Sequence, residues 1–193
     1  MKSCCTLIIL LISLSTFAQC SDLITITKKE FDQYYTKGDS TTYSPDFVKQ
    51  GNTVKVPGTD SVYTDSDENE DGIIVYVPHG VIFGNVYVLE VGDEIMSHYR
   101  LISTDPYLDK EIIGFPYIFG NYILAIENPH TDYQVTLQLW CTKNKGKSIS
   151  FQLKKELSLG KCGLYGIVAT YIYNGFIYLK NNANAVSYYK IKI

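Results

Sequence analysis

The chain has 193 residues, and 17 Lys and Arg against 20 Asp and Glu give it a formal net charge of −3 at pH 7. Seventeen Tyr against one Trp, many Ile and Val, and 14 Gly indicate a β-rich protein, and no Ala-, Leu- and Glu-rich segment is long enough for a helical bundle. We therefore expect an all-β fold. A nucleic-acid partner is not expected.

The first 19 residues have the pattern of a secretory signal peptide. A short basic start, Met1-Lys2, is followed by the apolar run Thr6–Leu14 and then by small residues that end at Ala18 and Gln19. The run is too short to cross the ~30 Å hydrocarbon core of a bilayer, and no later stretch reaches that length. The sequence therefore predicts a secreted protein without a transmembrane segment, extracellular or, in a bacterium, periplasmic.

Three of the five cysteines remain after removal of such a signal, because Cys4 and Cys5 leave with it. Cys20 then lies at the N-terminus, and Cys141 and Cys162 lie within the β-rich part. In an oxidising compartment two neighbouring cysteines are more often paired than free. We expect a disulfide between Cys141 and Cys162, with Cys20 as the unpaired residue.

Residues 20–57 form a polar N-terminal segment, and residues 58–72 an acidic, turn-rich segment expected to be a loop. Within the first segment, Thr27 is followed three positions later by Glu30, which is a capping-box pattern. One or two helical turns are therefore predicted after Thr27. The β-rich domain is expected at residues 73–193.

The acidic segment contains half of a calcium-binding loop. Asp67, Asn69 and Asp71 supply oxygens at positions 1, 3 and 5, and Gly72 follows at position 6. Position 12, where such a loop closes with a bidentate carboxylate, holds Pro78. Asp67, Asn69 and Asp71 are thus candidate Ca²⁺ ligands, the alternative being a solvated acidic loop. No other cofactor is expected.

A hairpin pattern recurs along the chain. β-branched and aromatic residues flank a Gly-Asn or Asn-Gly pair, the dipeptides typical of two-residue turns. A polar turn and a further apolar strand follow each copy, and a fainter copy surrounds Gly51-Asn52. The three clear copies are Val81–Leu89, Tyr117–Ala125 and Tyr171–Leu179, with turns at Gly84-Asn85, Gly120-Asn121 and Asn174-Gly175.

These repeated hairpins, with an aromatic residue before the turn, resemble the middle strands of kelch-like β-propeller blades. The resemblance covers Val81–Ile193. It implies repeated antiparallel hairpins in a small or incomplete β-propeller-like array. A β-sandwich whose meander reuses one hairpin pattern is the alternative.

The charges separate along the chain. Residues 58–140 contain 14 acidic and 2 basic side chains, a net charge of −12, whereas residues 141–193 contain nine Lys and one Glu, a net charge of +8. A lysine-rich region of this kind favours an anionic glycan, a lipid surface or an acidic protein. Charge complementarity between strands of one domain is the alternative. The candidate ligand-binding residues are Lys143, Lys145, Lys147, Lys154 and Lys155.

The sequence contains no recognisable catalytic motif. His79, His98 and His130 lie apart without metal-ligand spacing, and Asp105 and Asp109 form a carboxylate pair of the kind that any acidic loop supplies. No catalytic residue is therefore assigned. The function we expect is a secreted, non-catalytic binding module for an extracellular protein or glycan. A secreted glycan-processing enzyme and a structural or assembly component are the alternatives.

Overall fold

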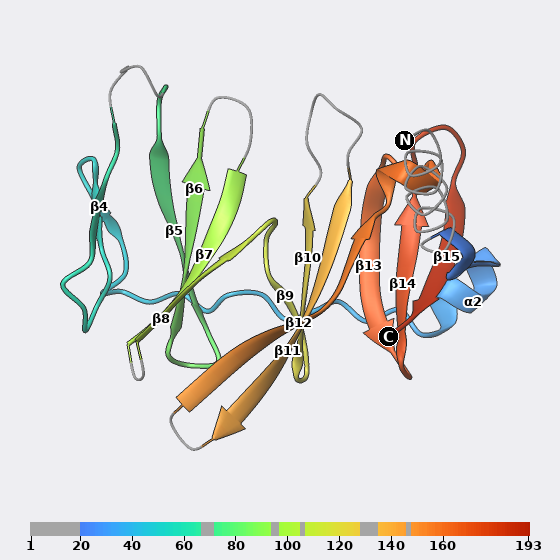
Figure 1. Cartoon of the computed structure of the whole chain (residues 1–193), viewed down its shortest axis with the longest axis horizontal. Coiled ribbons are helices and arrows are strands. Elements are labelled where there is room, and N and C mark those ends of the chain that lie inside the picture. Colours follow the sequence, from blue (N-terminus) through green and yellow to red (C-terminus); the bar gives the residue numbers. More distant parts are fainter. Residues whose placement is uncertain (1–19, 67–71, 94–96, 105–106, 128–134, 146–147) are drawn as a thin grey trace, which may run out of the picture. The chain divides into compact units, whose positions relative to one another are not determined.

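The computed structural model of the chain describes residues 20–66, 72–93, 97–104, 107–127, 135–145 and 148–193 (Figure 1). These residues form four antiparallel sheets and little helix, which confirms the all-β prediction. None of the described helices has the length and hydropathy needed to cross a membrane. The expected signal peptide, residues 1–19, lies outside the described residues.

The chain divides into two compact units. The first, here called the terminal unit, combines Met1–Lys37 and Tyr133–Thr136 with Leu157–Ile193. The second, the three-sheet unit, combines Gly38–Asp132 with Leu137–Glu156.

One four-stranded sheet in the terminal unit joins the two ends of the chain. Its strand order is β1 (Leu23–Ile26), β15 (Ser187–Lys192), β14 (Phe176–Asn181) and β13 (Ile167–Tyr173). The N-terminal strand β1 pairs antiparallel with the C-terminal strand β15. A long-range pairing of this kind can form only after β15 has been made.

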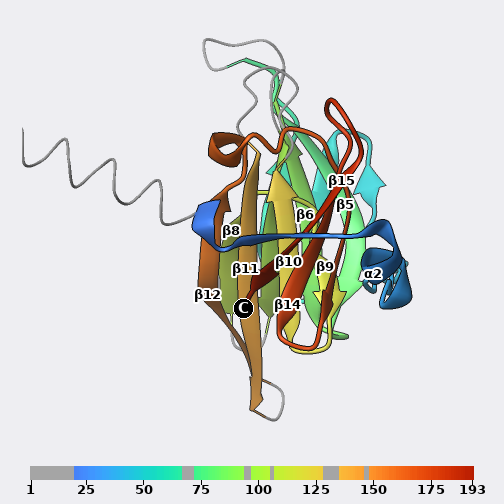
Figure 2. The ribbon, with the colours of Figure 1, turned by 90° about the vertical axis from the view of Figure 1, so that its right-hand side faces the viewer.

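Helix α2 (Lys28–Gln33) packs against that sheet, next to β15 (Figures 1 and 2). The Thr27 hydroxyl accepts a hydrogen bond of 3.1 Å from the Glu30 amide, so the predicted helix start is confirmed. Phe31 is buried, with its ring centroid 5.1 Å from that of Tyr171, and the Tyr171 hydroxyl donates to the Phe31 carbonyl at 2.7 Å. The Glu30 carboxylate pairs with Lys190 of β15 at 2.7 Å. The helix is thus held by both apolar and polar contacts.

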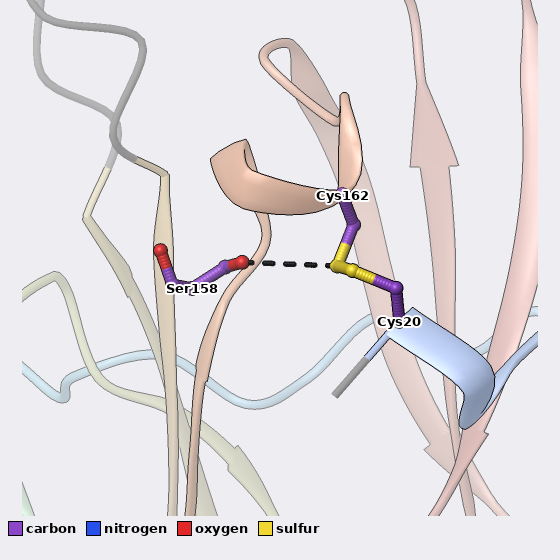
Figure 3. Close-up of a disulfide and its surroundings, with 3 residues drawn as sticks. All are labelled: Cys20, Ser158 and Cys162. Carbon is purple, nitrogen blue, oxygen red and sulfur yellow. Dashed lines mark hydrogen bonds between the residues drawn. A yellow bond between two sulfur atoms is a disulfide. The ribbon is translucent and has the colours of Figure 1, made fainter. Parts of the chain in front are cut away.

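The predicted Cys141–Cys162 disulfide is wrong. Cys162 is bonded to Cys20 (Figure 3), with a Cα–Cα distance of 5.5 Å. Cys141 is free. The reason lies in the topology: Cys141 is part of β11 (Thr136–Lys145), whereas Cys162 ends the short 3-10 helix η1 (Gly160–Cys162) in the terminal unit. Pairing of β1 with β15 brings Cys20 into this same unit. The disulfide therefore fixes the N-terminal end of β1.

The other three sheets belong to the three-sheet unit. One contains β2 (Lys49–Gln50), β3 (Thr53–Lys55) and β4 (Val62–Thr64), so part of the segment expected as an acidic loop is a strand. The central sheet contains β5 (Val75–Ile82), β6 (Val86–Gly92), β7 (Ser97–Thr104) and β8 (Tyr107–Ile112). The last contains β9 (Tyr117–Phe119), β10 (Tyr122–Glu127), β11 and β12 (Ser148–Ser158).

The central sheet is covered on both faces. Val88 and Leu101 point into a core shared with Ile123 and Trp140 of the β9–β12 sheet. Leu89 and Ile102, which alternate with them along β6 and β7, point into a second core with Phe47, Val54 and Val56. Three sheets are thus stacked face to face, an arrangement that both a partial propeller array and a sandwich contain.

The segment that precedes β2 runs along the free edges of two sheets (Figure 1). The backbone of Asp39 exchanges hydrogen bonds of 2.9 and 3.0 Å with Ile118 of β9, and Thr42 exchanges two of 2.8 Å with Val81 of β5. These bridges satisfy backbone groups that a sheet edge would otherwise leave open. They also position β5, which carries part of the candidate site.

The predicted two-residue hairpins are confirmed at Gly120-Asn121 and Asn174-Gly175, and the fainter copy at Gly51-Asn52 forms one too. At Gly84-Asn85 the predicted two-residue turn is wrong. Ile82 pairs with Val86, so the loop contains three residues. Phe83 there has a positive φ of 52° and packs against the core. Phe83 is the additional loop residue, and three-residue loops are a common class of hairpin connection.

Candidate functional site

A β-bulge in strand β5 places a histidine on the face of the central sheet. Val77 pairs with Glu90 and Gly80 with Val88, so β5 has an extra residue between Pro78 and Gly80. Such a bulge changes the direction of a side chain. The Nε2 atom of His79 lies 2.6 Å from the Glu90 carboxylate. An ionised carboxylate only accepts hydrogen bonds, so Nε2 carries the proton in this pair.

Tyr99 lies directly opposite Glu90 on the neighbouring strand β7. Burial raises the pKa of the Tyr99 hydroxyl to about 12, and the negative charge of Glu90 and a hydrogen bond to its carboxylate add to the rise. The phenol therefore stays protonated and donates to the carboxylate at physiological pH. His79 and Tyr99 hold Glu90 from two sides.

Aromatic rings surround this group. The Phe115 ring centroid is 5.5 Å from that of His79, 5.7 Å from Tyr99 and 5.2 Å from Tyr117, with edge-to-face geometry in each pair. Phe115 is half-buried, and Tyr117 is 40% exposed. We refer to these five residues, His79, Glu90, Tyr99, Phe115 and Tyr117, as the Glu90 cluster.

A shallow groove of about 240 Å³ opens beside the Glu90 cluster. Its apolar part comes from β5, where Val75 and Val77 are exposed, and Glu90 belongs to both the groove and the cluster. Val75, Val77, Glu90 and Gly92 occupy paired positions on one face of the sheet. The residues of this Glu90 groove are Ile73, Val75, Val77, Glu90, Gly92 and Asp93.

The opposite face of the central sheet carries a separate ion pair. Arg100 binds the Asp109 carboxylate through two nitrogens, one of them Nε at 3.0 Å, and its guanidinium carbon is 5.1 Å from the centre of the Tyr63 ring. Asp109 is therefore engaged in a structural contact, while Asp105 lies outside the described residues.

The predicted lysine site is placed on one pair of neighbouring strands. Lys143 lies in β11 and Lys154 in β12, both exposed, and the half-buried Lys155 follows in β12. Lys145 belongs to β11, and Lys147 lies outside the described residues. We call the lysines of these two adjacent strands the lysine ribbon. Lys154 and Lys155 are consecutive in β12 and so point to opposite faces of the sheet, and none of these lysines lines the Glu90 groove.

The predicted calcium ligands Asp67, Asn69 and Asp71 also lie outside the described residues. Within the part of the chain that the structure describes, no group of three or more His, Cys, Asp or Glu side chains has metal-binding geometry.

Sequence reasoning missed the Glu90 cluster, because His79 was interpreted as a lone histidine. One signal was present: Pro78-His79-Gly80 interrupts an otherwise apolar strand, and Gly within a strand often marks a bulge. The pairing partner Glu90 is 11 residues away and could be found only with the strand register.

Comparisons with protein-family models, with curated proteins and with solved structures find no match to this chain.

Proposed function

We propose that this protein is a secreted, non-catalytic binding module and that its ligand contacts the Glu90 groove. The observation that carries the proposal is that Glu90, a carboxylate held by His79 and Tyr99 beside aromatic rings, also lines an open groove with two exposed valines. Binding sites commonly combine an apolar surface with a few placed polar groups.

Two features support secretion. The N-terminal sequence has the three-part pattern of a signal peptide, and the Cys20–Cys162 disulfide is of the kind that persists in oxidising compartments. Cys20 directly follows the expected cleavage region, so the mature chain keeps this disulfide.

The internal bonding of the Glu90 cluster supports binding rather than catalysis. The imidazole and the phenol are both used to hold one carboxylate in place. A rigid arrangement of this kind, built on paired strands, orients a contact surface. The scaffold is the central sheet, which is packed on both faces.

The lysine ribbon is a second candidate contact, for an anionic partner such as a sulfated glycan. The exposure of Lys143 and Lys154 on adjacent strands favours it. This contact is independent of the Glu90 groove and is tested separately.

The experiment for the main proposal is a binding screen with three proteins. The mature wild type, Glu90→Gln and Glu111→Gln are each tested against a panel of glycans and small cationic, anionic and neutral compounds. Glu111 is the matched control, since its carboxylate is exposed on the same sheet and lies outside the groove. We expect hits that Glu90→Gln weakens and Glu111→Gln retains. Hits that both variants retain in full would contradict the proposal.

A further inference from the structure

The Glu90 groove has an apolar part and an anionic part. Val75 is 36% and Val77 is 39% exposed, and both line the groove. The carboxylates of Glu90 and Asp93 line the same groove. A ligand that fits both parts has an aliphatic body and a positively charged end.

Glu90 has acceptor capacity left for such a ligand. A carboxylate offers about four lone-pair positions on two oxygens. His79 binds Oε2, and the Tyr99 hydroxyl supplies one further hydrogen bond. The remaining positions suit an ammonium group, which has three N–H donors and no acceptor.

The electrostatic surroundings favour a cation. Residues 58–140 contain 14 acidic side chains and only two basic ones, Arg100 and Lys110. Arg100 is bound to Asp109, and the Lys110 ammonium lies 5.0 Å from the centre of the Trp140 ring. Both basic side chains of this stretch are therefore engaged elsewhere, and the part of the chain that supplies every residue of the groove has a net negative charge.

The size of the groove sets the kind of ligand. About 240 Å³ accommodates one short alkyl chain and is below the volume that drug-sized ligands occupy. The backbone edge of β5 beside it is already bonded, since Ile74 pairs with Ser66 and the Tyr76 amide donates to Asp65. An added peptide strand has no open edge there.

We propose that the Glu90 groove binds a small aliphatic ammonium compound, with the alkyl chain over Val75 and Val77 and the ammonium at Glu90. The inference rests on the proposed function and deepens it by naming the ligand class.

The test is calorimetric titration of the mature protein with n-hexylammonium chloride, sodium hexanoate and 1-hexanol. We expect hexylammonium to bind at least about tenfold more tightly than either comparison compound, because one charge-assisted hydrogen bond to Glu90 contributes that much affinity. Added salt should weaken its binding. Equal or tighter binding of hexanoate or hexanol would overturn the inference.

Variants locate the site. Glu90→Gln should lose about tenfold or more in affinity for hexylammonium, and Val75→Lys, a change at an exposed position that need not disturb folding, should abolish binding. Glu111→Gln should leave the affinity unchanged. Equal losses in Glu90→Gln and Glu111→Gln, or full binding by Val75→Lys, would refute the location.

Two further results would identify a different ligand: a lysine side chain of another protein, or a compound without a positive charge. An acetylated and amidated Gly-Lys-Gly peptide that binds more tightly than hexylammonium would identify a protein side chain as the ligand and overturn the assignment to a small molecule. A neutral or anionic hit whose binding needs Glu90 would leave the proposed function standing while this inference fails.

Discussion

Gly80 occupies a position that no other residue fits. Its φ is +105°, and a Cβ there would lie 2.2 Å from the Thr42 carbonyl oxygen. Gly84 also has a positive φ, of +80°, yet a Cβ there would meet nothing within 4 Å. An alanine at Gly84 would therefore introduce backbone strain alone, whereas an alanine at Gly80 would introduce both backbone strain and steric overlap.

We expect Gly84→Ala to lower the free energy of unfolding by roughly 1–2 kcal/mol, the cost of a left-handed conformation. Gly80→Ala should cost an additional ~1–3 kcal/mol, because the Thr42 segment must move away from β5. Urea unfolding of both variants measures the difference. Equal losses would show that the segment does not lie against Gly80.

Tyr99 gives a prediction for the dependence of stability on pH. Its pKa is about 12 in the folded protein, above the ordinary value of 10.0. A raised folded-state pKa means that the stabilisation by the protonated phenol is complete below pH 10 and is lost as the pH rises through 12. Tyr99→Phe should therefore lose less stability than the wild type between pH 10 and 12.

Thermal unfolding at a series of pH values, with both proteins measured in parallel, checks this. Identical pH profiles for the wild type and Tyr99→Phe would contradict the bond between Tyr99 and Glu90.

Residues also show where sequence reasoning reached its limit. Local patterns predicted the Thr27 cap and the turns at Gly120-Asn121 and Asn174-Gly175, because these depend on neighbouring residues. The pair of His79 and Glu90 depends on a bulge and on strand register, which are set by tertiary packing.

At the scale of elements, strand β1 is fixed at both ends. Cys20 precedes it and is bonded to Cys162, and α2 follows it and packs on Tyr171. The sequence predicted a disulfide between cysteines close in the chain. The actual partner is 142 residues away and is brought near only by the pairing of β1 with β15.

A disulfide that closes so long a loop should stabilise the fold by about 5 kcal/mol in the chain-entropy model. We expect Cys162→Ser to lose a large part of this, and Cys141→Ser, at a free cysteine, to lose little. Urea unfolding of both variants compares them. Peptide mapping without reduction should recover Cys20 linked to Cys162; a Cys141–Cys162 peptide would contradict the assignment.

At the scale of the whole molecule, the sequence predicted the all-β class, because hairpin patterns recur through the chain. It did not predict the division into two units, since β1 joins the C-terminal strands from the other end of the sequence. The separation of charge, −12 in residues 58–140 and +8 in residues 141–193, is a property of composition and needs no fold.

This charge separation predicts behaviour on an anionic matrix. Replacing Lys143, Lys154 and Lys155 with Gln should cause earlier elution from heparin in a salt gradient. Gln at Lys29, Lys37 and Lys55 changes the net charge equally and serves as the control. We expect a smaller change for the control. Equal shifts, or no retention of the wild type at low salt, would contradict an anionic contact at the lysine ribbon.

The central claim is that the Glu90 groove is the contact surface of a binding module. Small organic fragments gather at binding grooves, so their sites can be mapped by amide chemical shifts in the ¹⁵N-labelled mature protein. The measurement is a fragment titration followed by ¹H–¹⁵N correlation spectra. We predict shifts concentrated at Val75, Val77, Glu90 and Gly92. Shifts concentrated on other strands, or spread evenly over the molecule, would contradict the claim.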